Sequence, residues 1–394
     1  PPPPHFSPTR PPPRSPRDSI RRQRQMCIRD SINGSGEWIT SHTYVVIEAE
    51  DTGICISGVK EIWYTISLWN QTQESWVVVQ NDTQYCGPFR IFEECKHKVT
   101  WWTYDNLMNK ETPQENIFHV DNTPPQSMKH FDGPLYMANN GTEEYIHVND
   151  TQIILTATDY PLGPCASGVK DIWYQIWIWN DEEWVLEQDN TLYTGPFTIT
   201  EICKHKLVWW AIDNLDNREA DNTNVFYVDG TPPLSYKVIG TPSYDTDGDT
   251  ITEYVKTGTP IWINTTDPRE CAAGVYYTWI EIWYDATGDG NDTELLLEQA
   301  QIQDGGWYNS DYLTGDLDGA ANGEISLKIQ FKEECLHKII WYSVDYVGNN
   351  EAIHEQFHYV DDTAPETQKE IGQPHYGDYV TTQTPIWLNS TDPG

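Results

Sequence analysis

The chain carries little positive charge and has no long apolar run. Its 394 residues include 24 lysines and arginines against 60 aspartates and glutamates, which gives a formal net charge of −36 at pH 7. A polyanion of this size repels nucleic acid and anionic lipid, so we expect neither as a partner. No apolar run approaches the roughly 18 residues that a membrane-spanning helix needs, so we expect no membrane insertion within this sequence.

Long stretches with a helical period are also missing, and so is any catalytic motif. Aromatic residues, in contrast, make up 13% of the chain, which is too many for a disordered chain of similar charge. The sequence therefore predicts folded domains with aromatic-rich strands.

The first residues differ in composition from the rest. Residues 1–32 are rich in proline and arginine, whereas the chain after them is strongly acidic. The segment QRQMCIRDS resembles translated sequencing-adapter read-through, and a disordered Pro/Arg-rich tail is the alternative. We treat 1–32 as a non-native or disordered leader, outside the fold.

One pattern is written three times after this leader. GVKEIWYTISLWN at 58–70 recurs as GVKDIWYQIWIWN at 168–180 and more loosely as GVYYTWIEIWYD at 274–285. A second block, GPFRIFEECKHKVTWWTYDNLMNKE at 87–111, recurs as GPFTITEICKHKLVWWAIDNLDNRE at 195–219, and a third version begins at Phe331. The spacing is domain-sized, so each copy should fold around its own core.

Each copy has matching borders. It closes on VD-x-T before proline, at 120–125, 228–233 and 360–365. Matching strands run to four aspartates, which are Asp51, Asp159, Asp267 and Asp392. These borders predict an N-terminally truncated repeat 1 (33–125), repeat 2 (126–233), repeat 3 (234–365) with an insertion at about 286–324, and the start of a truncated repeat 4 (366–394).

Within a copy the residues alternate with a period of two. Ile172, Tyr174 and Ile176 share one face of a strand, whereas Trp173 and Trp177 share the other. Gly, Pro, Asn and Asp cluster between such runs. Short strands with these turn signals are typical of an all-β fold, here tandem antiparallel β-sandwiches arranged in a rod.

Several segments resemble a known group of domains. TATDYPLGPCASGVKDIWYQI, YTGPFTI, HKLVWWAIDN and VDGTPP resemble bacterial and archaeal Ig-like (fibronectin-III-like) repeats of secreted and cell-surface proteins. The resemblance covers nearly all of residues 33–394. It implies spacer, adhesion or enzyme-appendage roles and carries over no catalytic residue.

The cysteines occupy two repeated slots in the three copies. Cys55, Cys165 and Cys271 precede the GV motif, whereas Cys95, Cys203 and Cys335 precede the repeated histidine. Two cysteines and one histidine per copy are too few for a zinc site, and the pattern favours disulfides in an oxidising compartment. We therefore expect an extracellular or cell-surface location.

The pairing of these cysteines has two possible forms. Bonds within a copy would join 55–95, 165–203 and 271–335. In a fibronectin-like sandwich, however, the two slots lie at opposite poles, and bridged cysteines need Cα atoms within about 7 Å. Strand counting therefore favours bonds between copies, Cys95–Cys165 and Cys203–Cys271, with a local Cys55–Cys86 bond in repeat 1.

No residue set predicts catalysis. His97, His205 and His337 recur once per copy, as structural positions do, and no Ser/His/Asp set has its own motif. We therefore expect no enzyme activity and no cofactor other than calcium. A weak calcium site is suggested by Asp245, Asp247 and Asp249, although the spacing is not that of an EF-hand.

Tryptophans on the outer strand faces give a second hypothesis, a surface for glycans or proteins. These residues are Trp63, Trp69, Trp102, Trp173, Trp177, Trp179, Trp210, Trp279 and Trp283. Cross-strand aromatic packing is the alternative. Glycosylation sequons lie at Asn70, Asn81, Asn140, Asn149, Asn264 and Asn291.

The sequence thus predicts a non-catalytic extracellular repeat array, a spacer or adhesive stalk whose first partners are its own neighbouring repeats. The alternative is a set of glycan-binding accessory domains of a larger secreted enzyme.

Overall fold

The structure is a computed structural model of the chain. It describes residues 37–51, 56–161, 163, 165–246, 252–268, 271–290, 295–303, 305, 307–316 and 324–392. These residues form strands almost throughout, with one short 3₁₀ helix, η1 (Asn139–Gly141). Among them, no helix is long and apolar enough to cross a membrane.

The same four-stranded antiparallel unit is present in all three repeats. In repeat 1 its order is β3-β2-β4-β5, and in repeats 2 and 3 it is β11-β10-β12-β13 and β19-β18-β23-β24. A further strand pairs in parallel with the last strand of each unit. These pairs are β1 with β5, β8 with β13 and β16 with β24. This strand order is that of a fibronectin-III-like sandwich and confirms the predicted fold class.

Repeat 1 has one five-stranded sheet. Opposite this sheet, the backbone of Val45 pairs with that of Phe89 in an isolated bridge. The strands of the sheet are β1 (Glu37–Ile39), β2 (Val59–Asn70), β3 (Ser75–Gln84), β4 (Cys95–Asp105) and β5 (Gln114–Val120).

Repeat 2 has a six-stranded sheet facing a two-stranded one, β6 with β9. A bridge between Ile153 and Phe197 widens the smaller sheet. The strands are β6 (Gln126–Asp132), β7 (Leu135–Ala138), β8 (Glu143–His147), β9 (Gln152–Thr158), β10 (Val169–Trp179), β11 (Trp184–Leu192), β12 (Cys203–Asp213) and β13 (Asn222–Asp229).

Repeat 3 is the largest, with sheets of six and five strands. Within the range expected to be an insertion, one strand is β19, which pairs with β18, and two others extend the second sheet. The strands are β14 (Leu234–Ile239), β15 (Ser243–Asp245), β16 (Thr252–Val255), β17 (Ile261–Thr266), β18 (Val275–Asp285), β19 (Leu295–Gln303), β20 (Trp307–Asn309), β21 (Leu313–Asp316), β22 (Ile325–Ile329), β23 (Cys335–Asp345) and β24 (His354–Val360).

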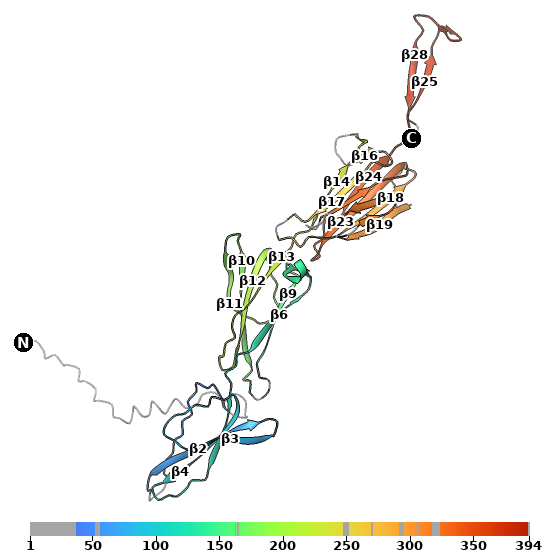
Figure 1. Cartoon of the computed structure of the whole chain (residues 1–394). Helices are drawn as coiled ribbons and strands as arrows, with labels where there is room; N and C mark the ends of the chain where they lie inside the picture. The colour runs from blue at the N-terminus through green and yellow to red at the C-terminus, as the bar shows by residue number, and fades with distance from the viewer. Residues whose placement is uncertain are drawn as a thin grey trace, which may run out of the picture.

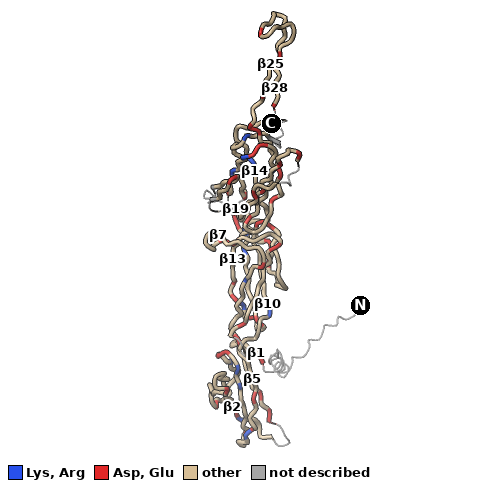
Figure 2. Tube along the Cα trace, turned by 90° about the vertical axis from the view of Figure 1, so that its right-hand side faces the viewer, with Lys and Arg blue, Asp and Glu red and all other residues tan. Residues whose placement is uncertain are grey.

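The segment after repeat 3 consists of two antiparallel strand pairs and extends beyond the third sandwich (Figure 1). Its strands are β25 (Glu366–Ile371), β26 (His375–Tyr376), β27 (Tyr379–Val380) and β28 (Ile386–Thr391). The three sandwiches and this segment follow one another along one axis, and acidic residues are distributed along the whole length (Figures 1 and 2). The described chain is therefore a rod.

Each sandwich has its own core, as the alternation of residues predicts. In repeat 2, Tyr174 and Ile176 of β10 are buried against Leu207, Trp209 and Phe226. Repeats 1 and 3 have separate clusters of the same kind. Burial of one large apolar side chain stabilises a fold by about 1.5–3 kcal/mol, so each repeat is held together mainly by its own cluster.

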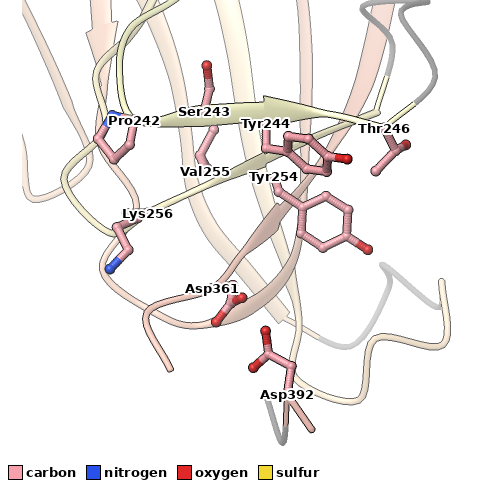
Figure 3. A pocket seen from close by; sticks show the side chains of 9 residues that line it. All are labelled: Pro242, Ser243, Tyr244, Thr246, Tyr254, Val255, Lys256, Asp361 and Asp392. Carbon is pink, nitrogen blue, oxygen red and sulfur yellow. The ribbon is translucent and has the colours of Figure 1, made fainter. Parts of the chain in front are cut away.

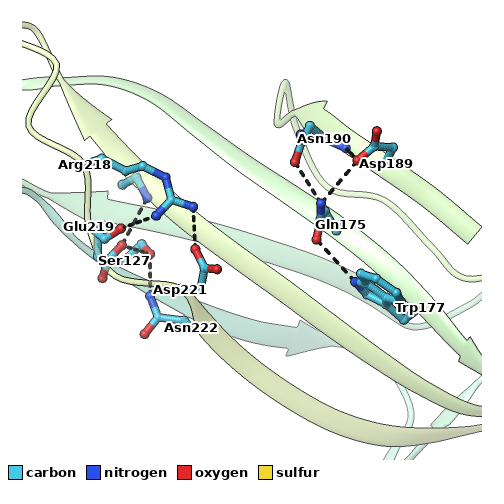
Figure 4. Close-up of polar contacts among 10 residues, drawn as sticks. Ser127, Gln175, Trp177, Asp189, Asn190, Arg218, Glu219, Asp221 and Asn222 are labelled. Atoms are coloured by element: carbon cyan, nitrogen blue, oxygen red, sulfur yellow. Dashed lines mark hydrogen bonds and ion pairs between the residues drawn. The ribbon is translucent and has the colours of Figure 1, made fainter. Parts of the chain in front are cut away.

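A glutamate, partly buried in repeat 2 and buried in repeat 3, fastens the first strand of each of these repeats to the turn after the histidine strand. Glu219 accepts hydrogen bonds from the Ser127 N–H (2.9 Å) and hydroxyl (2.5 Å), and Asn222 donates to the same hydroxyl (3.2 Å; Figure 4). In repeat 3, Glu351 accepts from the Ser235 N–H at 2.6 Å. The first strand, and with it the connection from the previous repeat, therefore has a fixed position.

Candidate functional sites at the domain junctions

Disulfides join consecutive repeats. Cys95, at the start of β4 in repeat 1, is bonded to Cys165 in the loop between β9 and β10 of repeat 2. Cys203, at the start of β12, is bonded in the same way to Cys271 of repeat 3. These are the two pairs that strand counting favours over bonds within a copy. We call the two regions junction 1 and junction 2.

The proposed local bond of repeat 1 has one end outside the described residues, because Cys55 is not among them. Cys86 is exposed and Cys335 is partly buried, and both are free thiols in the described part of the chain.

Each repeated histidine holds the backbone of the cysteine two residues before it. Cys95, Cys203 and Cys335 all have positive φ, of 87°, 89° and 104°. Such a conformation costs a non-glycine residue about 1–3 kcal/mol. Two residues later a buried histidine ring donates from Nδ1 to the cysteine carbonyl, at 3.1 Å for His97 and His205. The histidine therefore has a structural position, as its recurrence predicts.

Three aspartates meet at junction 1. Asp121 follows β5 of repeat 1, Asp159 follows β9 of repeat 2, and Asp213 ends β12. All three are buried, and one carboxylate oxygen from each lies within 4.8 Å of the others. Asp121 accepts a hydrogen bond across the junction from the Ser167 N–H at 2.7 Å. Repeat 1 thus places one carboxylate beside two carboxylates of repeat 2.

Junction 2 repeats this arrangement. Asp229 ends β13 of repeat 2, Asp267 follows β17 of repeat 3, and Asp345 ends β23. Their carboxylate oxygens also lie within 4.8 Å of one another. Asp229 accepts from the Ala273 N–H of repeat 3 at 2.7 Å. We call the two groups the aspartate triads.

The triads are electrostatically unfavourable as bare anions. Two like charges about 5 Å apart repel by about 3 kcal/mol at an effective dielectric constant of about 20. Burial raises the pKa of Asp159 to about 6, and the charges of Asp121 and Asp213 raise it further. Burial raises the pKa of Asp267 to about 7, with the charge of Asp229 acting in the same direction. In the described part of the chain, no lysine or arginine pairs with a triad carboxylate.

Two aspartates in equivalent turns, one outside a junction and one inside, show how burial changes the pKa. Asp105 of repeat 1 and Asp345 of repeat 3 both accept hydrogen bonds from the backbone and side chain of an asparagine four residues later. The Asn109 side chain lowers the pKa of Asp105. At Asp345, burial raises the pKa to about 6 despite the corresponding bonds from Asn349. The difference comes from burial, because Asp345 is only 1% exposed whereas Asp105 is partly exposed.

Parts of the triad pattern recur at both ends of the described chain. In repeat 1, Asp51 accepts from the Gly58 N–H at 2.7 Å, as Asp159 does from Gly168 at 2.6 Å. After repeat 3, Asp361 and Asp392 face the same cleft, which also contains Tyr254 and has a volume of about 510 Å³ (Figure 3).

Carboxylate oxygens are the donors that hard divalent cations prefer, whereas zinc and copper favour histidine and cysteine. The cysteines next to each triad are oxidised to disulfides and cannot act as thiolate ligands. The triads could therefore hold Ca²⁺ or Mg²⁺. Of the weak calcium site at Asp245, Asp247 and Asp249, only Asp245 lies within the described residues.

The nine tryptophans of the predicted ligand surface are covered to varying degrees, and none is fully exposed. Trp102 and Trp210 retain only 9% and 8% of their surface. Lys110 and Arg218 lie over these two rings, each 4.4 Å from the ring centre. Trp177 donates from its indole N–H to Gln175 (Figure 4). These rings contact cationic and polar neighbours, and such contacts stabilise a sheet surface.

The sequons occupy different surroundings. Asn81, Asn140 and Asn149 are exposed, whereas Asn70 and Asn264 are partly buried. The Asn264 side chain accepts a hydrogen bond from the Ser326 hydroxyl at 2.6 Å within a sheet. Asn291 lies outside the described residues.

Four of the six triad positions lie at the VD-x-T borders and at the ends of the matching strands described above, but the sequence does not show that they meet. The sequence contains the signal for each position: VD-x-T closes each repeat, an aspartate ends the strand before each GV motif, and another aspartate ends the strand that contains each repeated histidine. The order of the repeats in space was needed to show that two of these aspartates belong to one repeat and one to its neighbour.

No protein-family model and no curated protein sequence matches the chain. Among solved structures, the FN1–FN3 domains of chicken CNTN1 are 12% identical, with 80% of this chain and 97% of that chain covered and a TM-score of 0.25. The fibronectin(III)-like modules of Clostridium thermocellum CbhA are 10% identical, with 59% and 94% covered and a TM-score of 0.26. The fold assignment of this chain rests on its own strand order.

Proposed function

We propose that the chain is a stiff, non-catalytic extracellular spacer or adhesive stalk, carried by a cell-surface or secreted protein. The observation that carries this proposal is the covalent bond between consecutive repeats at both junctions. Domain interfaces within a chain usually allow relative motion. A disulfide across the interface, next to backbone hydrogen bonds from Ser167 and Ala273, restricts that motion.

The location follows from the same bonds. Disulfides persist in oxidising compartments, outside the cell or in the secretory pathway, and are rare in the cytosol. The strong negative charge fits a solvated surface that stays soluble without a partner.

Small-angle X-ray scattering tests the stiffness. We expect the oxidised chain to scatter as one extended rod. A variant with both Cys95→Ser and Cys165→Ser should bend at junction 1, with a broader distribution of end-to-end distances. Cys86→Ser is the matched control, because it removes an exposed free thiol away from the junctions. A wild-type distribution as broad as that of the double variant would contradict the proposal.

The alternative function is glycan binding by the outer strand faces. Titration of oligosaccharides while tryptophan fluorescence is recorded separates it from a packing role. A saturable change that is lost in Trp177→Ala would favour binding, whereas no response to any glycan would favour packing.

A further inference from the structure

Each junction contains a group of oxygen ligands drawn from two repeats, fully buried at junction 1 and, at junction 2, buried except for the partly buried Asp267. The three carboxylates of a triad converge within 4.8 Å, and two of the three come from the repeat that follows the junction. Such a convergence of like charges is costly unless a positive charge is present. The geometry is the same at both junctions, so it is built by the repeat itself and does not depend on one loop.

Among the described residues, one carboxylate oxygen at each junction has no hydrogen-bond partner. Asp159 is only 6% exposed, and its Oδ1 is buried and unpaired, whereas its Oδ2 accepts from the Gly168 N–H. The Oδ1 of Asp267 is also buried and unpaired, and its Oδ2 accepts from the Gly274 N–H. A buried acceptor is seldom left unpaired in a folded protein, so an oxygen of this kind within a carboxylate group indicates a position suited to a ligand.

The remaining triad oxygens are held in place by backbone amides and by asparagine side chains. At junction 1, Asp213 accepts from the N–H groups of Leu215 and Asn217 at 2.8 and 2.7 Å. The Asn217 side chain also donates to the backbone carbonyl of Asp121 in repeat 1, at 3.2 Å. These bonds fix the carboxylates before any ion arrives, which lowers the ordering cost of binding.

We propose that each aspartate triad binds one divalent cation, Ca²⁺ by preference, which connects consecutive repeats beside the disulfide. Ca²⁺ accepts six to eight oxygen ligands in flexible geometry, from carboxylates and water. Mg²⁺ demands a stricter octahedron and usually keeps several waters. A site of three carboxylates fixed by protein turns suits the less demanding ion. The cation adds an ion-dependent link to the rod, beyond the covalent one.

Calcium titration of the full chain by isothermal calorimetry, after removal of bound ions with a chelator, tests the proposal. We expect two sites per chain, one for each complete triad. Calcium modules outside cells have Kd values of about 10⁻⁴–10⁻³ M, so the titration should reach about 10 mM. Asp159→Asn and Asp267→Asn should each remove one site, and Asp132→Asn, an exposed residue of β6, should remove none.

A stability measurement in the same variants distinguishes an ion ligand from a merely structural carboxylate. In chelator, Asp159→Asn should melt at a higher temperature than the wild type, because it removes one of the repelling charges. With saturating Ca²⁺ the order should reverse, because only the wild type binds the ion at junction 1. A structural carboxylate would give the same order in both conditions.

The wild type alone provides a further test if a variant fails to fold. Ca²⁺ should slow hydrogen exchange at Ser167 and Ala273, whose amides donate to triad carboxylates, and leave strand centres far from the junctions unchanged. Absence of heat, of a shift in melting temperature and of local protection up to about 10 mM Ca²⁺ would overturn the proposal. In that case a shared proton, and not a cation, neutralises the triads.

Discussion

At the scale of single residues, the protonation of the repeated histidines affects the stability of the rod. Each ring is buried, with Nδ1 bonded to the carbonyl of the cysteine two residues earlier, which is a junction cysteine for His97 and His205 and the free Cys335 for His337. Burial lowers the pKa of His97 and His205, and it lowers the pKa of His337 to about 4. The neutral ring is therefore the form that supports the cysteine backbone.

This burial predicts a loss of stability in mild acid. Between pH 6.5 and about 4, His337 takes up a proton in the unfolded chain but not in the folded one. The unfolded state then binds more protons, so the free energy of unfolding falls as pH falls, by up to about 3 kcal/mol. Denaturant titrations of the wild type and of His337→Asn over this pH range measure the effect.

His42→Asn provides the control, because His42 is exposed. It should lose stability with pH as the wild type does, whereas His337→Asn should have a shallower slope. Parallel slopes for all three proteins would show that His337 does not contribute.

At the scale of strands, the fastening of β14 in repeat 3 depends on one glutamate. Both Glu351 oxygens accept from the Ser235 hydroxyl, at 2.8 and 2.7 Å, and the Trp341 indole N–H donates to the same hydroxyl at 2.9 Å. Glu351 is 9% exposed. Removal of its carboxylate leaves buried donors without an acceptor, which costs about 1–3 kcal/mol per group.

We therefore expect Glu351→Ala to lower the denaturant midpoint of repeat 3 and to speed hydrogen exchange in β14. Glu355→Ala is the matched control, since its half-exposed carboxylate only pairs with Lys338 at 3.9 Å. Such a surface pair contributes about 0–1 kcal/mol. Equal effects of the two substitutions would contradict the role given to Glu351.

Much of the fold at this scale could be predicted from the sequence, because a period of two in Ile172, Tyr174 and Ile176 reports directly which face is buried. The parallel pairing of β8 with β13 could not, since it depends on contacts distant in sequence. For the same reason the triads were missed. Asp121 and Asp213 are far apart along the chain, and nothing local to either shows that they meet.

The described chain is a rod, and the stiffness that we propose for it depends on its junctions. A fibronectin-III-like sandwich is stable by itself, and the sequence of repeats already predicts several of them. The way in which two repeats connect depends on the loops at the facing ends of their sandwiches. At junction 1 these loops supply the disulfide, the Ser167 hydrogen bond and the triad together. The junctions are therefore the regions where substitutions should change the shape of the rod without unfolding a domain.

The disulfides also determine how the rod carries tension. A pull on its two ends passes from Cys95 directly to Cys165 and from Cys203 directly to Cys271, so the chain between each pair is spared the load. Those pairs are 70 and 68 residues apart, so after reduction, unfolding of these segments would add about 240 and about 230 Å of contour length. Single-molecule stretching with and without reductant should reveal these two lengths. Under force, a spacer with these bonds extends only through the short segments outside the two disulfide loops. The redox state of its surroundings therefore determines how far it can extend.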